Sequence, residues 1–122
     1  MHELSTMIRL VDLAERRARE AGAGKILRIE VSVGEMTGIL PYWLERYFPE
    51  ASQGTAAQGA LLQIRSVPVR VCCLGCGCGY IPDRGTDRAC PLCGSIRGKI
   101  LSGREITLDR LELEDSSGTV CR

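Results

Sequence analysis

The spacing of apolar residues predicts an amphipathic helix near the start of the chain. Apolar side chains recur three and four residues apart through segment 4–20, as expected for a helix with one buried face. That face comprises Leu4, Met7, Ile8, Val11, Ala14 and Ala18, with Leu10 at its margin. Gly22 and Gly24 follow, and glycine is common just past a helix end. The helix needs a second layer to cover its apolar face.

Pro41 predicts the start of a second helix, because its missing N–H is not needed in a first turn. The apolar residues that follow fall on one face: Trp43, Leu44, Tyr47 and Phe48. Pro49 is expected to stop or kink this helix. Residues 52–60 are small and polar, which indicates a connection.

Alternation with a period of two predicts three strands. In the first, Leu27, Ile29, Val31 and Val33 alternate with polar residues up to Gly34. The second has Leu62 and Ile64 and ends at Pro68. In the third strand, the apolar residues are first the even-numbered Ile106 and Leu108 and then the odd-numbered Leu111 and Leu113. Such a switch in parity predicts a bulge near residues 109–110.

The order of these elements predicts an α+β fold, with two helices on a small three-stranded sheet and an inserted zinc-ribbon-like module. Residues 1–70, completed by 103–114, would form the main α/β domain. The cysteine-rich segment 71–102 would be the inserted module, and 115–122 a flexible tail.

Two Cys-x-x-Cys pairs indicate a metal site in that module. Cys73 and Cys76 are separated from Cys90 and Cys93 by residues 77–89, and nearby glycines at 75, 77, 79 and 94 suit tight turns around thiolates. Four thiolates at this spacing favour a tetrahedral structural Zn²⁺. The alternatives are two disulfides or a redox pair, although a redox site needs only one Cys-x-x-Cys. The remaining cysteines, Cys72, Cys78 and Cys121, are interpreted as spare thiols.

Composition narrows the class of protein. The 122 residues include 16 basic and 15 acidic side chains, so the net charge is close to zero. A charge this small gives little attraction for nucleic acid or an anionic membrane. Seven cysteines without a signal peptide indicate a reducing compartment, so a cytoplasmic location is expected.

The opening residues Met1, His2 and Glu3 form a second candidate site. His2 is the only histidine, and a histidine at position two can offer its imidazole and amide nitrogens together with the Met1 amine. Such nitrogen-rich sets suit Ni²⁺ or Cu²⁺. The alternative is that His2 is an idle residue at a frayed end.

Several short motifs together resemble the HypA/HybF family, the nickel-insertion accessory proteins of [NiFe]-hydrogenase maturation. They are the opening residues 1–5, Val33-Gly34-Glu35, the glycine-rich segment 54–60 and the four cysteines with Pro91 and Leu92. The resemblance implies a nickel metallochaperone with Ni²⁺ as transient cargo at Met1, His2 and Glu3, and structural zinc at Cys73, Cys76, Cys90 and Cys93. It also implies a hydrogenase large-subunit precursor and a maturation GTPase as partners.

No catalytic arrangement is recognised, so the protein is not expected to be an enzyme, nor to bind nucleic acid or membrane. A monomer or weak homodimer is expected. Three features depart from the family's pattern: no histidine beside the zinc cysteines, Pro49, and the extra Cys72 and Cys78. The rival hypothesis is a zinc-ribbon adaptor that binds nucleic acid or a protein without any nickel role. A thiol oxidoreductase would need an exposed cysteine of low pKa.

Overall fold

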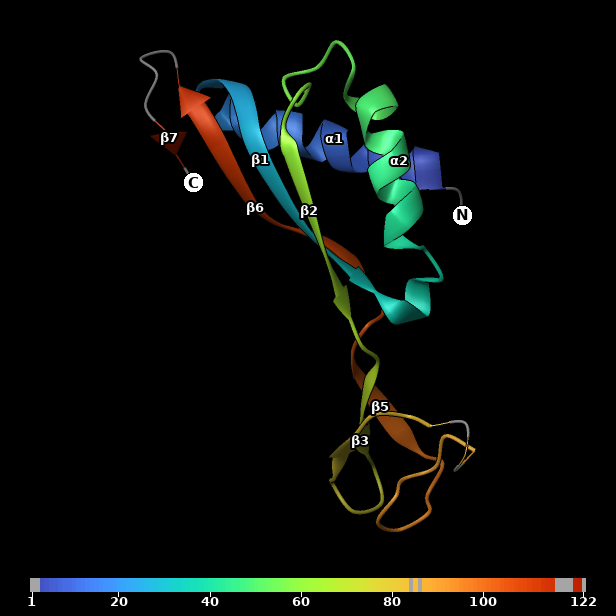
Figure 1. Ribbon diagram of the computed structural model, residues 1–122. Helices are drawn as coiled ribbons and strands as arrows, with labels where there is room; N and C mark the ends of the chain where they lie inside the picture. The colour runs from blue at the N-terminus through green and yellow to red at the C-terminus, as the bar shows by residue number, and fades with distance from the viewer. Residues whose placement is uncertain (1–2, 84, 86, 116–119, 122) are drawn as a thin grey trace. The chain divides into compact units, whose positions relative to one another are not determined.

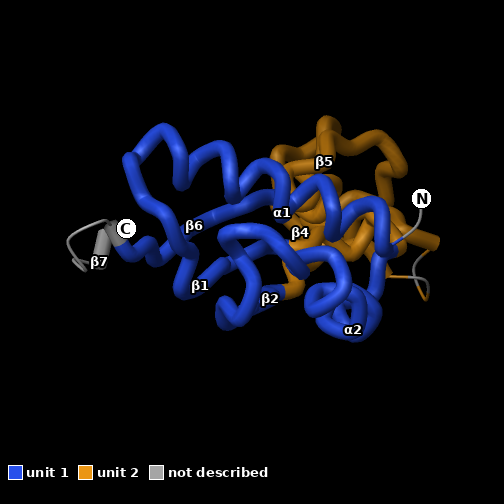
Figure 2. The backbone as a smooth tube through the Cα atoms, turned by 90° about the horizontal axis from the view of Figure 1, so that it is seen from above, with its two compact units in different colours: residues 1–32, 39–65, 107–122 blue, residues 33–38, 66–106 orange. Residues whose placement is uncertain are grey.

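The computed structural model describes residues 3–83, 85, 87–115 and 120–121 (Figure 1). The chain divides into two compact units (Figure 2). Unit 1 comprises residues 1–32, 39–65 and 107–122, and unit 2 comprises 33–38 and 66–106. Unit 2 is therefore longer than the module predicted at 71–102, and it takes in a segment from the first half of the chain. No helix among the described residues is long and apolar enough to cross a membrane.

Helix α1 (Glu3–Glu20) forms where apolar periodicity predicted it, and Gly22 follows with a φ of 75°. Its buried residues are Thr6, Met7, Leu10, Val11, Ala14 and Ala18. Ile8, predicted on the buried face, is 50% exposed. The prediction for Ile8 was wrong for a geometric reason. Successive residues of a helix are about 100° apart, so Ile8 lies at the edge of the buried face on which Met7 is fully buried.

Helix α2 (Pro41–Ser52) begins at Pro41 as predicted, and buries Leu44 and Phe48. Trp43 is 41% exposed, because its ring lies along the helix surface against the rings of Tyr42 and Tyr47. Pro49 does not stop the helix, which continues to Ser52. A proline in the last turn removes one backbone donor without preventing the final residues from remaining helical.

Strands β1 (Ala23–Gly34), β2 (Leu61–Val67), β6 (Ile106–Asp115) and β7 (Val120–Cys121) form a mixed sheet with the order β2-β1-β6-β7. β1 and β2 run in the same direction, with α2 as the crossover between them, and β6 runs opposite (Figure 1). β7 pairs antiparallel with β6. Two residues of the expected flexible tail therefore form an edge strand, because β6 offers them an open row of backbone groups.

Burial along β1 follows the predicted alternation only in part, because Leu27 is half-buried while its neighbour Ile26 is fully buried, and Ser32, expected on the polar side, is buried between Val31 and Val33. Ile29 and Val31 are buried at 0% and 1% exposure. Leu108 and Leu111 are both buried although they differ in parity, so the parity switch in the third strand is confirmed. The bulge proposed to cause it stays a prediction.

The loop after α2 anchors α1 to the sheet within unit 1. The amide of Ala56 donates to the Glu15 carboxylate at 3.1 Å, and the carbonyl of Ala56 accepts from Ile26 N–H at 2.9 Å. Ala57 beside it is fully buried. The glycine-rich segment 54–60 therefore has a structural role.

Unit 2 contains a second sheet, which the sequence pattern did not predict. Its strands are β3 (Arg70–Cys73), β4 (Gly79–Tyr80) and β5 (Gly98–Ser102), in the order β4-β3-β5. Both neighbours pair antiparallel with β3. Val71, Cys73, Tyr80 and Cys90 form a small buried cluster against it.

Within unit 2, the segment 33–38 includes the 3-10 turn η1 (Glu35–Thr37) and is hydrogen-bonded to residues 103–105. Gly34 N–H donates to Glu105 C=O and Met36 N–H donates to Gly103 C=O, each at 2.8 Å. A Cβ on Gly34 would lie 2.3 Å from the carbonyl carbon of Gly103. Only glycine fits at position 34 without a shift of the backbone.

Candidate metal centre

Two turns with the same backbone hydrogen bonds carry the four cysteines predicted to bind zinc. In the first turn, Gly77 N–H donates to Cys73 C=O and Cys73 N–H donates to Cys78 C=O. In the second turn, Gly94 N–H donates to Cys90 C=O and Cys90 N–H donates to Ser95 C=O. All four hydrogen bonds are 2.8 to 2.9 Å long. Gly77 and Gly94 have φ values of 79° and 75°, a region that other residues rarely adopt. The Cys-x-x-Cys-Gly pattern thus folds twice into one local structure.

The four sulfur atoms lie close enough together to bind a single metal ion. All four Sγ atoms lie within 4.8 Å of one another. Two short separations join the two turns, at 3.5 Å between the Sγ atoms of Cys73 and Cys93 and 3.6 Å between those of Cys76 and Cys90. Zn–S bonds of 2.3 Å at tetrahedral angles would place sulfur atoms about 3.8 Å apart. The donor set therefore fits one Zn²⁺ with little movement.

Backbone amides prepare two of the four sulfurs for metal binding. The amides of Cys76 and Gly75 donate to Cys73 Sγ at 3.4 and 3.3 Å. The Cys76 amide is the main reason that the pKa of Cys73 falls to about 6, against the opposing effect of burial. The amide of Cys93 likewise lowers the pKa of Cys90. The thiolate of Cys73 is thereby favoured at neutral pH, and the pKa of Cys90 shifts in the same direction.

The other two sulfurs retain their protons more strongly. The amide of Cys78 lowers the pKa of Cys76, but the facing thiol of Cys90 and burial together raise it above the ordinary value. Metal binding displaces such protons, since a bound thiol is a thiolate.

The two turns present one buried and one exposed cysteine each. Cys73 and Cys90 are 1% and 2% exposed, whereas Cys76 and Cys93 are exposed. One side of the metal centre is packed on the small core of unit 2 and the other faces solvent.

The structure excludes two of the spare cysteines from the sulfur cluster. Cys72 on β3 directs its thiol to the carbonyls of Cys73 and Gly77, at 3.9 and 3.8 Å. Cys78 directs its thiol to Gly79 C=O and packs against the core of unit 2. Cys121 lies in β7.

Sequence reasoning missed the contribution of residues 78 and 95. Each supplies the carbonyl that closes its turn, so Cys78 and Ser95 are equivalent positions. Alignment of segment 73–78 with segment 90–95 would have revealed this, because both read Cys-x-x-Cys-Gly followed by a small polar residue.

The second candidate site falls largely outside the described residues. Met1 and His2 are not among them, and Glu3 is the first residue of α1. α1 itself is firmly packed, with Met7 fully buried one turn later.

The chain is similar to known proteins over most of its length. A family profile described as "HypA: Hydrogenase/urease nickel incorporation, metallochaperone, hypA" matches residues 1–113. The hydrogenase maturation factor HypA of Chlorobium limicola is 36% identical over 115 residues, which cover 94% of this chain and 98% of that protein. The HypA of Roseiflexus sp. is 38% identical over 118 residues, covering 96% and 95% of the two chains.

Similarity extends to solved structures. The solution structure of the Ni metallochaperone HypA from Helicobacter pylori superposes with a TM-score of 0.71 at 27% sequence identity, covering 95% of this chain and all of that one.

Proposed function

This chain belongs to the HypA family of nickel-incorporation metallochaperones for hydrogenase maturation, and from that membership we propose that it binds Ni²⁺ through Met1, His2 and Glu3 while Cys73, Cys76, Cys90 and Cys93 hold a structural Zn²⁺. The carrying observation is the family match over residues 1–113, which includes the Met-His-Glu opening and all four cysteines. The nickel is cargo, to be delivered to a hydrogenase large-subunit precursor with the help of a maturation GTPase.

The chemistry of the opening residues supports a nickel role. The Met1 amine, the His2 imidazole and the amides of His2 and Glu3 are nitrogen donors that can form fused chelate rings, which suit the tetragonal preference of Ni²⁺. Glu3, the third of the proposed nickel-binding residues, begins α1, and Met7 one turn later is fully buried. Nitrogen ligands at a terminus also exchange readily, as a carrier requires.

The sulfur geometry supports a structural role for zinc. Four mutually close thiols leave no open position for a substrate, and closed four-coordinate sites of this kind stabilise folds. Zinc bound there would supply cross-links between the two turns. We expect the protein to be a carrier without catalytic activity.

The proposal is tested by Ni²⁺ titration of untagged, zinc-loaded protein in a calorimeter. His2→Ala, acetylation of the Met1 amine and one residue added before Met1 should each abolish tight binding, because each removes or relocates a nitrogen of the chelate. Wild-type binding should weaken as pH falls through about 6.5, where protons compete for the imidazole.

Arg9→Ala, a change at an exposed position of α1, is the control variant and should bind Ni²⁺ normally. Zinc content should be the same in all variants. Equal Ni²⁺ affinity in His2→Ala and wild type would reject the nickel carrier and favour the zinc-ribbon adaptor.

A further inference from the structure

The three-stranded sheet of unit 2 has two faces of different character. Val71 pairs with Tyr80 on β4 and with Ile100 on β5, and residues paired in this way share a face. Val71 and Tyr80 are buried in the small core beside the metal centre, and Ile100 packs against that core. Since side chains alternate along a strand, Arg70 and Cys72 lie on the opposite side of β3, which we call the outer face.

The register of β5 places basic residues on the outer face. Lys99 is the partner of Cys72, so its side chain shares that face. Beyond the end of β3, Leu74 N–H donates to Arg97 C=O at 2.9 Å, which continues the pairing by one step. Leu74 and Arg97 each lie two residues from the pair of Cys72 and Lys99, so both belong to the outer face.

The Arg70 guanidinium lies over β4 on this same face. Gly79 is the partner of Cys72 on β4, so a side chain at position 79 would extend from the outer face. A Cβ on Gly79 would stand 3.9 Å from a terminal nitrogen of Arg70. The outer face therefore carries three cations, which are Arg70, Arg97 and Lys99.

These three cations are not neutralised by the described part of the chain. All are exposed, and none forms an ion pair or a side-chain hydrogen bond with a described residue. The loop that carries Asp83 and Asp87 is held on the core side of the sheet. There the Tyr80 hydroxyl donates to Arg88 C=O at 3.4 Å, and Arg88 N–H donates to Asp83 C=O at 2.8 Å. The outer face thus presents uncompensated positive charge.

Exposed apolar surface accompanies this charge. Leu74 is 62% exposed. Leu101, the residue that the register skips between Ile100 and Ser102, is 57% exposed. Tyr80 is the only aromatic residue of unit 2 and is buried on the other face, so the outer face has no ring on which a nucleic-acid base could stack. Cations beside aliphatic side chains favour a protein partner with carboxylates and apolar residues.

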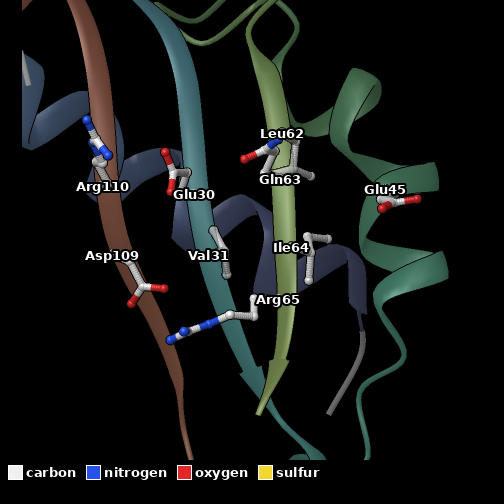
Figure 3. A pocket seen from close by; sticks show the side chains of 9 residues that line it. All are labelled: Glu30, Val31, Glu45, Leu62, Gln63, Ile64, Arg65, Asp109 and Arg110. Carbon is white, nitrogen blue, oxygen red and sulfur yellow. The ribbon is translucent and has the colours of Figure 1, made fainter.

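The groove in the sheet of unit 1 offers no such selection of charge. It has a volume of about 610 Å³, and both signs of charge line it: Glu30, Glu45, Asp109, Arg65 and Arg110 (Figure 3). Arg65 donates there to Ser32 Oγ, and Ser32 in turn donates to Asp109. Its positive charge is therefore already close to a carboxylate.

We propose that the outer face of the unit 2 sheet binds an acidic amphipathic helix of a partner protein. A helix laid on a sheet face adds the second layer that this face lacks. Apolar side chains four residues apart would contact Leu74, and carboxylates on the flanks of the helix would pair with Arg70, Arg97 and Lys99. The inference goes beyond metal binding, and it holds whether or not the opening residues bind nickel.

The test is an NMR titration of full-length, zinc-loaded protein with three synthetic helical peptides. The first has leucines on one face and glutamates on the other, the second replaces every glutamate by lysine, and the third has the composition of the first in scrambled order. We expect the glutamate peptide to shift the amides of residues 70–74 and 97–101 and to bind about tenfold more tightly than the lysine peptide. The scrambled peptide should bind about tenfold more weakly, because its leucines do not share a face.

Two double variants with the same net charge localise the binding. Arg97→Glu with Lys99→Glu should weaken binding of the glutamate peptide about tenfold. Lys25→Glu with Arg104→Glu makes the same charge change at exposed positions outside the outer face and should bind as the wild type does. Arg70→Gln, a milder change, should weaken binding about threefold and keeps the test available if the first double variant loses its zinc.

A pair of leucine variants tests the apolar contribution. Leu74→Ser should weaken binding of the glutamate peptide about threefold, because it removes the apolar contact. Leu92→Ser, at an exposed position of the second cysteine turn, should leave the affinity unchanged.

A single-stranded oligonucleotide tests the other class of acidic partner and should bind about tenfold more weakly than the glutamate peptide. The proposal is wrong if the oligonucleotide binds as tightly, if the control double variant loses as much affinity as the outer-face variant, or if the shifted amides lie outside β3, β5 and their neighbours. Concentration-dependent shifts of the same amides without any peptide would also overturn it, because a second copy of the chain would then cover the face.

Discussion

At the scale of single residues, backbone amides distinguish the cysteines of the metal centre from their neighbours. Cys73 Sγ accepts two amide hydrogen bonds, whereas the thiols of Cys72 and Cys78 are directed to carbonyls. An amide that donates to a sulfur atom stabilises the thiolate, which is the form that binds a metal ion. The difference follows from the turn that each Cys-x-x-Cys-Gly segment adopts.

Replacement of Cys78 by serine should leave zinc content unchanged at about one ion per chain. Cys78→Ser gives the first turn the residue that already stands at the equivalent position 95 of the second. Cys72→Ser should also retain zinc, because its thiol lies outside the sulfur cluster. Metal analysis after dialysis measures this, with Cys76→Ser as the variant expected to lose the ion. Zinc loss in Cys72→Ser or Cys78→Ser would show that the ligand set is wrong.

At the scale of elements, periodicity predicted which helices and strands exist but not how each is rotated or completed. The helical spacing of Met7, Val11, Ala14 and Ala18 was sufficient to predict α1. The exposure of Ile8 could not be predicted, because it depends on which face of the helix packs against the sheet. Trp43 contacts the rings of Tyr42 and Tyr47 along the surface of α2 and remains 41% exposed, although periodicity placed it on the buried face. β7 and the second sheet were missed because strands of two to five residues are too short to show a period.

For the candidate metal centre too, the sequence predicted the residues involved but not their burial. Cysteine spacing was sufficient to select the four residues that the fold brings together, because each pair lies within one turn. Which cysteine of each pair is buried depends on packing against Val71 and Tyr80, from β3 and β4.

Proline in the last turn of α2 should cost stability. Pro49 is exposed and lies inside the helix, so its ring and missing donor weaken the turn without a compensating buried contact. Pro49→Ala should raise the free energy of unfolding by about 1–2 kcal/mol, less than the full helical penalty because proline also restricts the unfolded chain. Urea unfolding measures the change, with exposed Glu50→Ala as the near-neutral comparison. A decrease on Pro49→Ala would show that the proline is favourable where it stands.

At the scale of the whole molecule, the two units differ in what stabilises them. Unit 1 has a core of helix and sheet residues, including fully buried Met7, Ile26, Ile29 and Leu44. Unit 2 has a buried cluster of four residues, two of which are cysteines of the metal centre. Small cores of this kind usually need a metal or disulfide to persist.

Removal of zinc should therefore loosen unit 2 and spare unit 1. After chelation, amides of Val71 and Tyr80 should exchange hydrogen rapidly, because the two turns lose their common ligand. Amides of Met7 and Ile29 should remain protected. Hydrogen exchange followed residue by residue gives both readings in one experiment. Equal protection of unit 2 with and without zinc would show that its fold is independent of the metal.

The contact of Gly34 with Gly103 has a consequence for dissecting the protein. A fragment cut at the ends of segment 66–106 would contain the four cysteines yet leave the carbonyls of Gly103 and Glu105 without their donors from Gly34 and Met36. Supplying residues 33–38 as a separate peptide should restore those bonds, so the fragment should gain thermal stability with the peptide and gain less when Gly34 of the peptide is alanine. The smallest autonomous zinc-binding piece is then two chains that complement each other.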